Sequence, residues 1–159
     1  MSVVKIPEIL KQKEGSIPKK ILKVLEIELV RSVRMNFAKQ GRPERWKPKL
    51  ITDGRKILSG KSGDLFSSIS SSISENRITV LFGTNYAEIH NRGGRIGVTK
   101  KMRKFFWAKY YETKKEVWKK LALTKKGYIE IPKREFALLT EEDLRRIITI
   151  LQRNIKNII

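Results

Sequence analysis

The clearest hydrophobic pattern is a helical stripe in the first quarter of the chain. Apolar residues recur every four positions from Ile21 to Phe37, which is the spacing of one face of an α-helix. Pro18 suits the first turn, where the missing N–H loses no partner, and Gly41 suits a helix end. The stripe predicts a long first helix with its apolar face in the core, and that face could also line a subunit contact.

A second stripe predicts the last helix, which begins at Thr140. Asp143 follows three residues later, a spacing typical of a capping box. The acids of this segment come early, where they suit the positive end of a helix dipole. The expected apolar face consists of Leu144, Ile147, Ile148, Leu151, Ile155 and Ile158.

Alternating apolar and polar residues predict three strands. Residues 69–82 alternate on both sides of Glu75 and Asn76, which suit a tight turn, so we expect a hairpin with serines on its solvent face. Tyr128–Ile131 alternates and stops at Pro132, as an edge strand does. We predict an α+β fold in which one small antiparallel sheet, made by the hairpin and Tyr128–Ile131, packs against the N- and C-terminal helices.

Glycine and proline break the segment from residue 40 to 62 into a long loop. Trp46 and Leu50 are the expected anchors of this loop. An indole between two cationic residues could stack on a base, but we favour the interpretation that Trp46 pins the loop to the core. Ser62 is the expected cap of a short helical turn that follows the loop.

The stretch from Gly83 to Gly94 is expected to be a junction in the fold. Gly83 and Asn85 suit a sharp turn, since both residue types tolerate positive φ. His90, the only histidine, is more typical of a structural hydrogen-bonding residue than of a metal ligand. Gly93 and Gly94 are expected to release the chain into a flexible segment. The residues expected to return to the core are Tyr86, Ala87 and Ile89.

Charge sets apart the segment that follows the junction. The chain of 159 residues has a formal net charge of +20, and residues 95–126 hold 12 lysines and arginines against two acids. Thr99 can cap a helix that runs to Tyr111, with aromatic residues among the lysines. Such aromatics could stack on nucleic acid, although we favour a small helical insertion with a buried aromatic face and a solvated basic face. We therefore predict a flexible N-terminal arm, residues 1–15, and one domain, residues 16–159, that includes the basic insertion.

The basic insertion is the predicted contact site, because its positive charge calls for an anionic surface opposite to it. That surface could belong to DNA or to an acidic protein. The residues expected to dock on the same or an adjacent subunit are Met102, Phe105 and Phe106. The cations expected to point outward, toward the partner, are Lys100, Lys101, Arg103, Lys104, Lys119 and Lys120.

Signatures of enzymes, metal sites and membrane spans are absent from the sequence. The lack of cysteine excludes disulfides and thiolate chemistry, and His90 has no cluster of metal-ligating residues around it. Gly60–Ser62 lacks the upstream glycine of a phosphate-binding loop, and no serine stands in a nucleophile elbow. No apolar run approaches the ~20 residues of a membrane span, and no signal peptide is recognisable. We expect no catalytic residue, metal, cofactor or membrane contact, and a cytoplasmic protein.

Four sequence blocks resemble a known family, in the same order and at similar spacing. They are Trp46–Leu50, Ser62–Ile69, Gly83–Gly94 and Ile131–Phe136, and Val98–Ala108 resembles one branch of that family. The blocks are similar to those of the Mu-like phage virion morphogenesis family, also called the phage tail completion family. The motif residues, for which the resemblance implies a structural role, are Trp46, Leu50, Gly63, Leu65, Tyr86, Ala87, His90, Gly93, Gly94, Pro132, Arg134 and Phe136.

The resemblance implies a small α+β structural protein of a phage or prophage, with no catalytic residues. Such proteins finish the head-proximal end of the tail or the neck, so that heads can join. We accordingly expect contacts with other virion proteins of the tail or neck, a homo-oligomeric ring in the particle and a non-specific DNA contact. Assembly would take place in the host cytoplasm and the protein would end in the virion. A non-sequence-specific nucleic-acid-binding protein is the alternative.

Overall fold

The computed structural model describes residues 17–60 and 62–156. The expected N-terminal arm, residues 1–15, and Ile158 lie outside the described residues, and the assignment of residues 16–159 to one domain stays a prediction. In chain order the elements are α1 (Lys19–Lys39), α2 (Asp64–Ser67), β1 (Ile69–Ser74), β2 (Arg77–Phe82), α3 (Ala87–Arg92), β3 (Gly94–Gly97), α4 (Lys100–Thr113), α5 (Glu116–Ala122), β4 (Tyr128–Ile131) and α6 (Glu141–Lys156).

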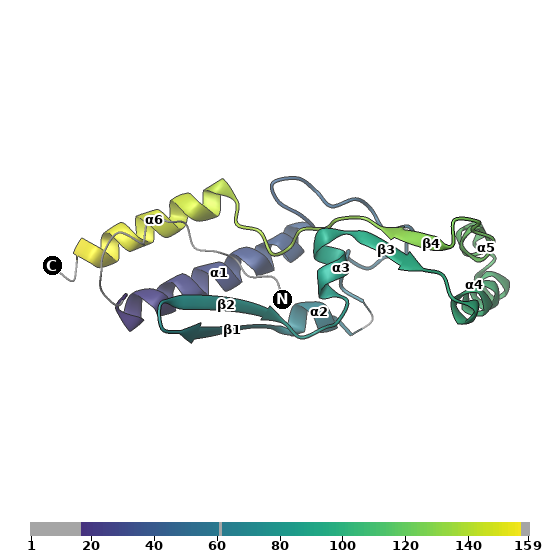
Figure 1. Cartoon of the computed structure of the whole chain (residues 1–159). Coiled ribbons are helices and arrows are strands. Elements are labelled where there is room, and N and C mark those ends of the chain that lie inside the picture. The colour runs from purple at the N-terminus through teal and green to yellow at the C-terminus, as the bar shows by residue number, and fades with distance from the viewer. Residues whose placement is uncertain (1–16, 61, 157–159) are drawn as a thin grey trace.

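The described chain is elongated and has two parts (Figure 1). At one end α1 lies between α6 and the β1–β2 hairpin. β3 and β4 run away from this end as a two-stranded ribbon, and α4 and α5 lie at its far tip. We call Gly94–Ile131, the ribbon with its two helices, the arm, and we call the rest of the described chain the body.

The strands form two separate antiparallel pairs rather than one sheet. β1 pairs with β2, and β3 pairs with β4 so that Gly94 lies opposite Ile131. The α+β class is confirmed, but the prediction that Tyr128–Ile131 joins the hairpin is wrong. The chain after Gly93 is a strand where the sequence predicted a flexible segment. Gly94–Gly97 contains a single β-branched residue, so it gives almost no strand signal.

α1 forms where the sequence predicts it and buries the apolar stripe from Ile21 to Phe37. The helix ends in a left-handed residue, Gln40, with φ 55°. The N–H of Gly41 then donates to the Asn36 carbonyl at 2.8 Å. A Cβ on Gly41 would lie 2.4 Å from a backbone carbonyl oxygen, so this turn requires glycine.

The β1–β2 hairpin packs on α1 and turns where the sequence predicts. The alternate serines from Ser70 to Ser74 are exposed, as expected. Ser71 differs, because it lies on the inner face and its hydroxyl donates to Glu26 Oε1 at 2.8 Å. Glu26 is buried in α1, and hydrogen bonds from Lys23 and Ser71 lower the pKa of its carboxyl. A buried carboxylate thus links α1 to the hairpin.

Phe136 lies at the centre of the body. Its side chain has 0% exposed surface, and its ring centroid lies 5.1 Å from that of Phe37 and 4.9 Å from that of Phe82. Trp46 meets Phe37 edge-on at 5.6 Å and is buried, so the prediction that Trp46 pins the loop to the core is confirmed. The prediction for Leu50 is wrong, because that side chain is 65% exposed.

α6 begins with the predicted capping box. The N–H of Asp143 donates to Thr140 Oγ1 at 3.3 Å, and the N–H of Thr140 donates to Asp143 Oδ2 at 3.0 Å. Ile147 and Leu151 pack against the core, in line with the predicted stripe. Ile148 is exposed instead, because it lies beside Ile147 and α6 covers the body with a narrower face than the stripe.

The short helix α2 has a different cap from the one expected. It starts at Asp64 after Gly63, whose φ is 73°, and no side chain caps it. The prediction that Ser62 caps this turn is therefore wrong. The helix still contributes to the core, because its Leu65 side chain is buried there.

Candidate functional site: the junction and the basic arm

The arm joins the body at α3, where the leaving and returning chains are bonded to each other. Gly93 has φ 74°, and a Cβ there would lie 2.8 Å from a backbone nitrogen of the returning chain. The Asn91 side-chain oxygen accepts from the Phe136 N–H at 2.9 Å. The Arg134 N–H donates to the His90 carbonyl at 2.9 Å. Both ends of the arm are thereby fixed at the surface of the body.

Arg134 ties the long loop to the same place. Its guanidinium is buried and donates to the carbonyls of Lys47 and Pro48, both at 3.3 Å. Burial lowers the pKa of Arg134. Trp46 and Phe136, which neighbour these groups in the chain, are buried as well. Motif residues from separate blocks thus meet at the base of the arm, where they have structural contacts.

His90 and Tyr86 lie on α3 and at its start. Burial, followed by the positive charge of Arg134, lowers the pKa of His90. The backbone of His90 accepts a hydrogen bond, but its buried Nδ1 has no partner among the described residues. Tyr86 meets the His90 ring edge-on at 5.9 Å and is 43% exposed, so its expected place in the core is wrong. Ala87 is buried, as predicted.

The β3–β4 ribbon of the arm carries exposed charged side chains on both strands. The Val98 N–H donates to the Gly127 carbonyl at 2.8 Å just beyond the last strand pair. The Arg95 guanidinium lies 4.6 Å from the centroid of the Tyr128 ring, a cation–π distance. Arg95 also pairs with Glu130 across the strands at 3.7 Å, an exposed pair that contributes little to stability.

The tip of the arm is a helical hairpin with a small aromatic core. Thr99 caps α4 as predicted, because its Oγ1 accepts from the Met102 N–H at 3.2 Å. Phe106 of α4 is buried and stacks on Trp118 of α5, with ring centroids 6.1 Å apart. Phe105 meets Trp118 edge-on but stays exposed. The aromatic side of α4 therefore packs mainly on α5 of the same chain.

Four of the cations predicted to point outward are exposed: Lys100, Lys101, Lys104 and Lys120. Arg103 is a correction, because its guanidinium turns inward and donates to the carbonyls of Ala122 at 2.5 Å and Thr124 at 3.0 Å. These carbonyls lie at the end of α5, where a helix leaves acceptors without amide partners. Lys119 is half-buried, with Nζ 5.6 Å from the centroid of the Tyr110 ring.

A second aromatic group lies elsewhere on α4, and sequence reasoning missed it. Trp107 and Tyr111 stack with their ring planes 27° apart, and Tyr111 is 64% exposed. Lys114 lies over the Tyr111 ring, with Nζ 5.6 Å from the ring centroid. The available signal was the four-residue spacing of Trp107 and Tyr111, which separates them on a helix from Phe106.

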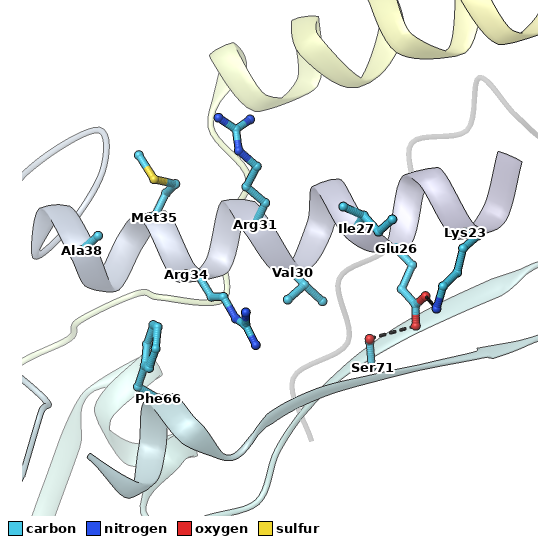
Figure 2. A pocket seen from close by; sticks show the side chains of 10 residues that line it. All are labelled: Lys23, Glu26, Ile27, Val30, Arg31, Arg34, Met35, Ala38, Phe66 and Ser71. Carbon is cyan, nitrogen blue, oxygen red and sulfur yellow. Dashed lines mark hydrogen bonds and ion pairs between the residues drawn. The ribbon is translucent and has the colours of Figure 1, made fainter. Parts of the chain in front are cut away.

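The body has an open groove of about 550 Å³ along α1. Figure 2 shows Val30 and Arg34 on the side of α1 that faces Phe66 and Ser71. Arg34 lies over the Phe66 ring, with Cζ 5.9 Å from the centroid. Ile27 and Phe66 are exposed in this groove, so the body presents apolar surface to its surroundings.

Neither a grouping of metal-ligating side chains nor a membrane-spanning helix is found in the described part of the chain. Within residues 17–60 and 62–156, no three histidine, cysteine or acidic side chains are grouped so that they could hold a metal ion. In the same part of the chain no helix has the length and apolar character needed to cross a membrane. The arm presents exposed lysines and the exposed rings of Phe105 and Tyr111.

Comparison with known proteins yields one family. The sequence model described as the phage virion morphogenesis family matches residues 6–156, which is nearly the whole chain. No curated protein and no solved structure matches the chain. The matched range contains the junction, the arm and the capped α6, so the match and the geometry concern the same elements. The chain belongs to the phage virion morphogenesis family.

Proposed function

We propose that this protein completes the head-proximal end of the phage tail, or the neck, and supports the joining of heads to tails. Its membership in a virion morphogenesis family gives the general role. The observation that carries the finer role is the division into a body and a projecting basic arm whose base is built by the motif residues. A subunit of this shape can contact its neighbours through the body and reach a further component with the arm.

The proposed role is structural rather than enzymatic. The buried polar groups of the body are used in holding the fold: Asn36 donates to the Phe136 and Leu138 carbonyls, both at 2.9 Å. Arg42 pairs with Asp143 at 2.9 Å and also donates to Ser32. These polar groups are bonded to each other within the fold, as expected for a subunit whose role is structural.

In this proposal the subunits form a ring by head-to-tail contact, assembled in the host cytoplasm and retained in the virion. The arms carry a large positive charge, so two copies repel each other there and must meet through their bodies. The groove along α1, with exposed Ile27 and Phe66, is the surface that we assign to the neighbouring copy. Replacing Ile27 with Asp should leave the fold intact and abolish ring formation on the tail.

The role is tested by deleting the gene from the phage or prophage. Separate heads and tails should accumulate in lysates, and a plasmid copy of the wild-type gene should restore joined particles. A variant in which a short glycine turn replaces the arm between Gly94 and Ile131 should fold but fail to restore them, because these residues lie opposite each other in the ribbon. Infectious particles from the deletion strain would contradict the proposal.

The alternative function is a nucleic-acid-binding protein without a role in the particle, and the charge of the arm favours it. The same deletion separates the two. Normal particles from the deletion strain, together with DNA binding by the purified protein, would support the alternative. Accumulated heads and tails would support the morphogenetic role whatever the protein binds in solution.

A further inference from the structure

α4 carries a row of basic and aromatic side chains on the face turned away from α5. Lys100, Lys104, Trp107 and Tyr111 are spaced by four, three and four residues, so they share one face of the helix. Phe106, which packs on α5, lies on the other side. Lys114 extends the row by lying over the Tyr111 ring. We call these five residues the α4 row.

The α4 row offers hydrogen-bond donors to an anion and contains no acidic side chain. Lys100 and Lys104 are exposed, and no acid stands in the first turn of α4. Cations at the start of a helix are unfavourable for the helix itself, so their presence there does not serve the stability of α4. The Tyr111 hydroxyl adds a neutral donor on a side chain that is 64% exposed.

A second copy of the chain cannot supply the opposite charge. Residues 1–94 hold 18 basic and 9 acidic residues, and residues 127–159 hold six and five, so every part of the chain is net positive. An acidic protein is disfavoured by composition, since lysine is depleted at protein–protein interfaces. Lysine contacts with phosphates, in contrast, supply most of the affinity of non-specific nucleic-acid binding.

The arrangement of the aromatic rings indicates whether the α4 row contacts the bases or the sugar–phosphate backbone of a nucleic acid. A base needs an open ring face on which to stack. Trp107 and Tyr111 are stacked on each other, and the Tyr111 ring also carries the Lys114 ammonium group. Stacking covers one face of each ring, so a base has less open ring surface here, while the ring edges and the tyrosine hydroxyl suit sugar and phosphate groups.

We propose that the α4 row binds the phosphate backbone of duplex DNA without reading its sequence. Lys100 and Lys104 contact phosphates, while Trp107 and Tyr111 pack their edges against the sugar–phosphate chain between them. The proposal goes beyond the role in the tail and does not depend on it, because the binding is a property of the purified full chain.

The first test measures the binding of a fluorescein-labelled 30-base-pair duplex by fluorescence anisotropy over a salt series. The variant Lys100→Glu/Lys104→Glu should bind at least about tenfold more weakly at low salt. The slope of log affinity against log salt should fall by about two, as expected for two lost phosphate contacts. The matched control is Lys19→Glu/Lys20→Glu, which changes the net charge equally at the exposed start of α1, far from the arm in Figure 1. It should weaken binding less than threefold.

The second test follows tryptophan fluorescence on adding the unlabelled duplex. Trp107→Phe should abolish the change in fluorescence that DNA causes, whereas Trp118→Phe should retain it, because Trp118 packs inside the helical hairpin. Both variants keep an aromatic ring, and circular dichroism checks that each remains folded.

Three results would overturn the proposal. The first is an equal loss of affinity in the Lys19→Glu/Lys20→Glu control, which would mean that total charge alone drives binding. The second is polyglutamate binding as tight as duplex binding at equal salt, which would indicate an acidic protein partner. The third is a clear preference for single-stranded over duplex DNA together with loss of affinity in Trp107→Phe, which would indicate base stacking.

Discussion

The body and the arm are stabilised in different ways. The core of the body joins residues that are far apart in the sequence, such as Phe37, Phe82 and Phe136 around one point. The arm is held mainly by neighbours in the chain, α4 against α5 and β3 against β4, and one hydrogen bond from Lys115 Nζ to the Thr52 carbonyl at 3.2 Å joins its tip to the loop of the body. Of its described residues only Phe106 and Ala122 are buried apolar groups. Hydrophobic stabilisation scales with buried apolar area, so the body supplies most of the stability.

The two parts also treat their charges differently. In the body, buried or half-buried acids are paired: Glu26 with Lys23, Glu28 with Arg146 and Asp143 with Arg42. Residues 95–126 of the arm have 12 cations and two acids, so most of those cations cannot find a partner in the same segment. Arg103 is used within the arm, where it donates to carbonyls at the end of α5, but exposed lysines such as Lys100 and Lys104 are available for a partner.

The largest effect is expected from removing the centre of the body. Phe136→Ala should lower the free energy of unfolding by about 4 kcal/mol, because a fully buried ring leaves a cavity that the packed core cannot close. Denaturant unfolding followed by circular dichroism measures it. Phe105→Ala, an exposed ring of the arm, is the control and should cost less than about 1 kcal/mol. Equal losses for the two variants would contradict the conclusion that the body supplies most of the stability.

The sequence predicts those features that depend on neighbouring residues. The periodicity of α1, the capping box of α6, the β1–β2 turn and the Thr99 cap all follow from local spacing. The pairing of β3 with β4 does not, because its four residues include two glycines and the pairing joins segments separated by two helices. Helical spacing also does not predict the direction of Arg103, because its guanidinium donates to carbonyls at the end of the next helix, α5.

The candidate site was predicted in part for the same reason. Composition located the basic segment, and helical spacing identified Phe106 as a packing residue. Which lysines remain exposed depends on how α5 folds back on α4, which no local pattern records. The Arg42–Asp143 pair was also unforeseen, since a loop and a helix start that are distant in sequence meet only in the folded body.

The second effect concerns that ion pair. Asp143→Asn should cost about 3 kcal/mol, because the Arg42 guanidinium, only 15% exposed, loses its counter-charge in a partly buried place. Glu141→Gln, at the first position of α6, is the matched control and should cost less than about 0.5 kcal/mol, because the Glu141 side chain is 88% exposed and its pair with Arg145 lies at the surface. Urea midpoints at pH 7 compare the two, and a similar loss in both variants would mean that only the helix dipole matters.

The same residue contributes to the loss of stability of the body in acid. Burial raises the pKa of Asp143, but hydrogen bonds from Ser32, the Thr140 backbone and Arg42 outweigh it and hold the pKa at about 2, below the ordinary 3.8. A lowered carboxyl pKa contributes stability that is complete above pH 4 and lost as pH falls toward 2, about 2 kcal/mol in all. Asp143→Asn should remove this part of the pH dependence, so wild type and variant should converge in stability near pH 2.

The smallest effect tests the junction between the two parts. Gly93→Ala should cost about 2 kcal/mol, because φ is 74° and the new Cβ would lie 2.8 Å from the Lys133 backbone nitrogen. Gly97→Ala, at the end of β3 and four residues after Gly93, is the control, since a Cβ there meets nothing within 4 Å and should cost almost nothing. Amide exchange at Arg134, whose N–H donates to the His90 carbonyl three residues before Gly93, reports on the junction itself. Faster exchange in Gly93→Ala with unchanged exchange at core amides of α1 would show that the base of the arm can loosen while the body stays folded. Faster exchange throughout would show that junction and body unfold as one unit. The contacts that attach the arm would then contribute to the stability of the whole body.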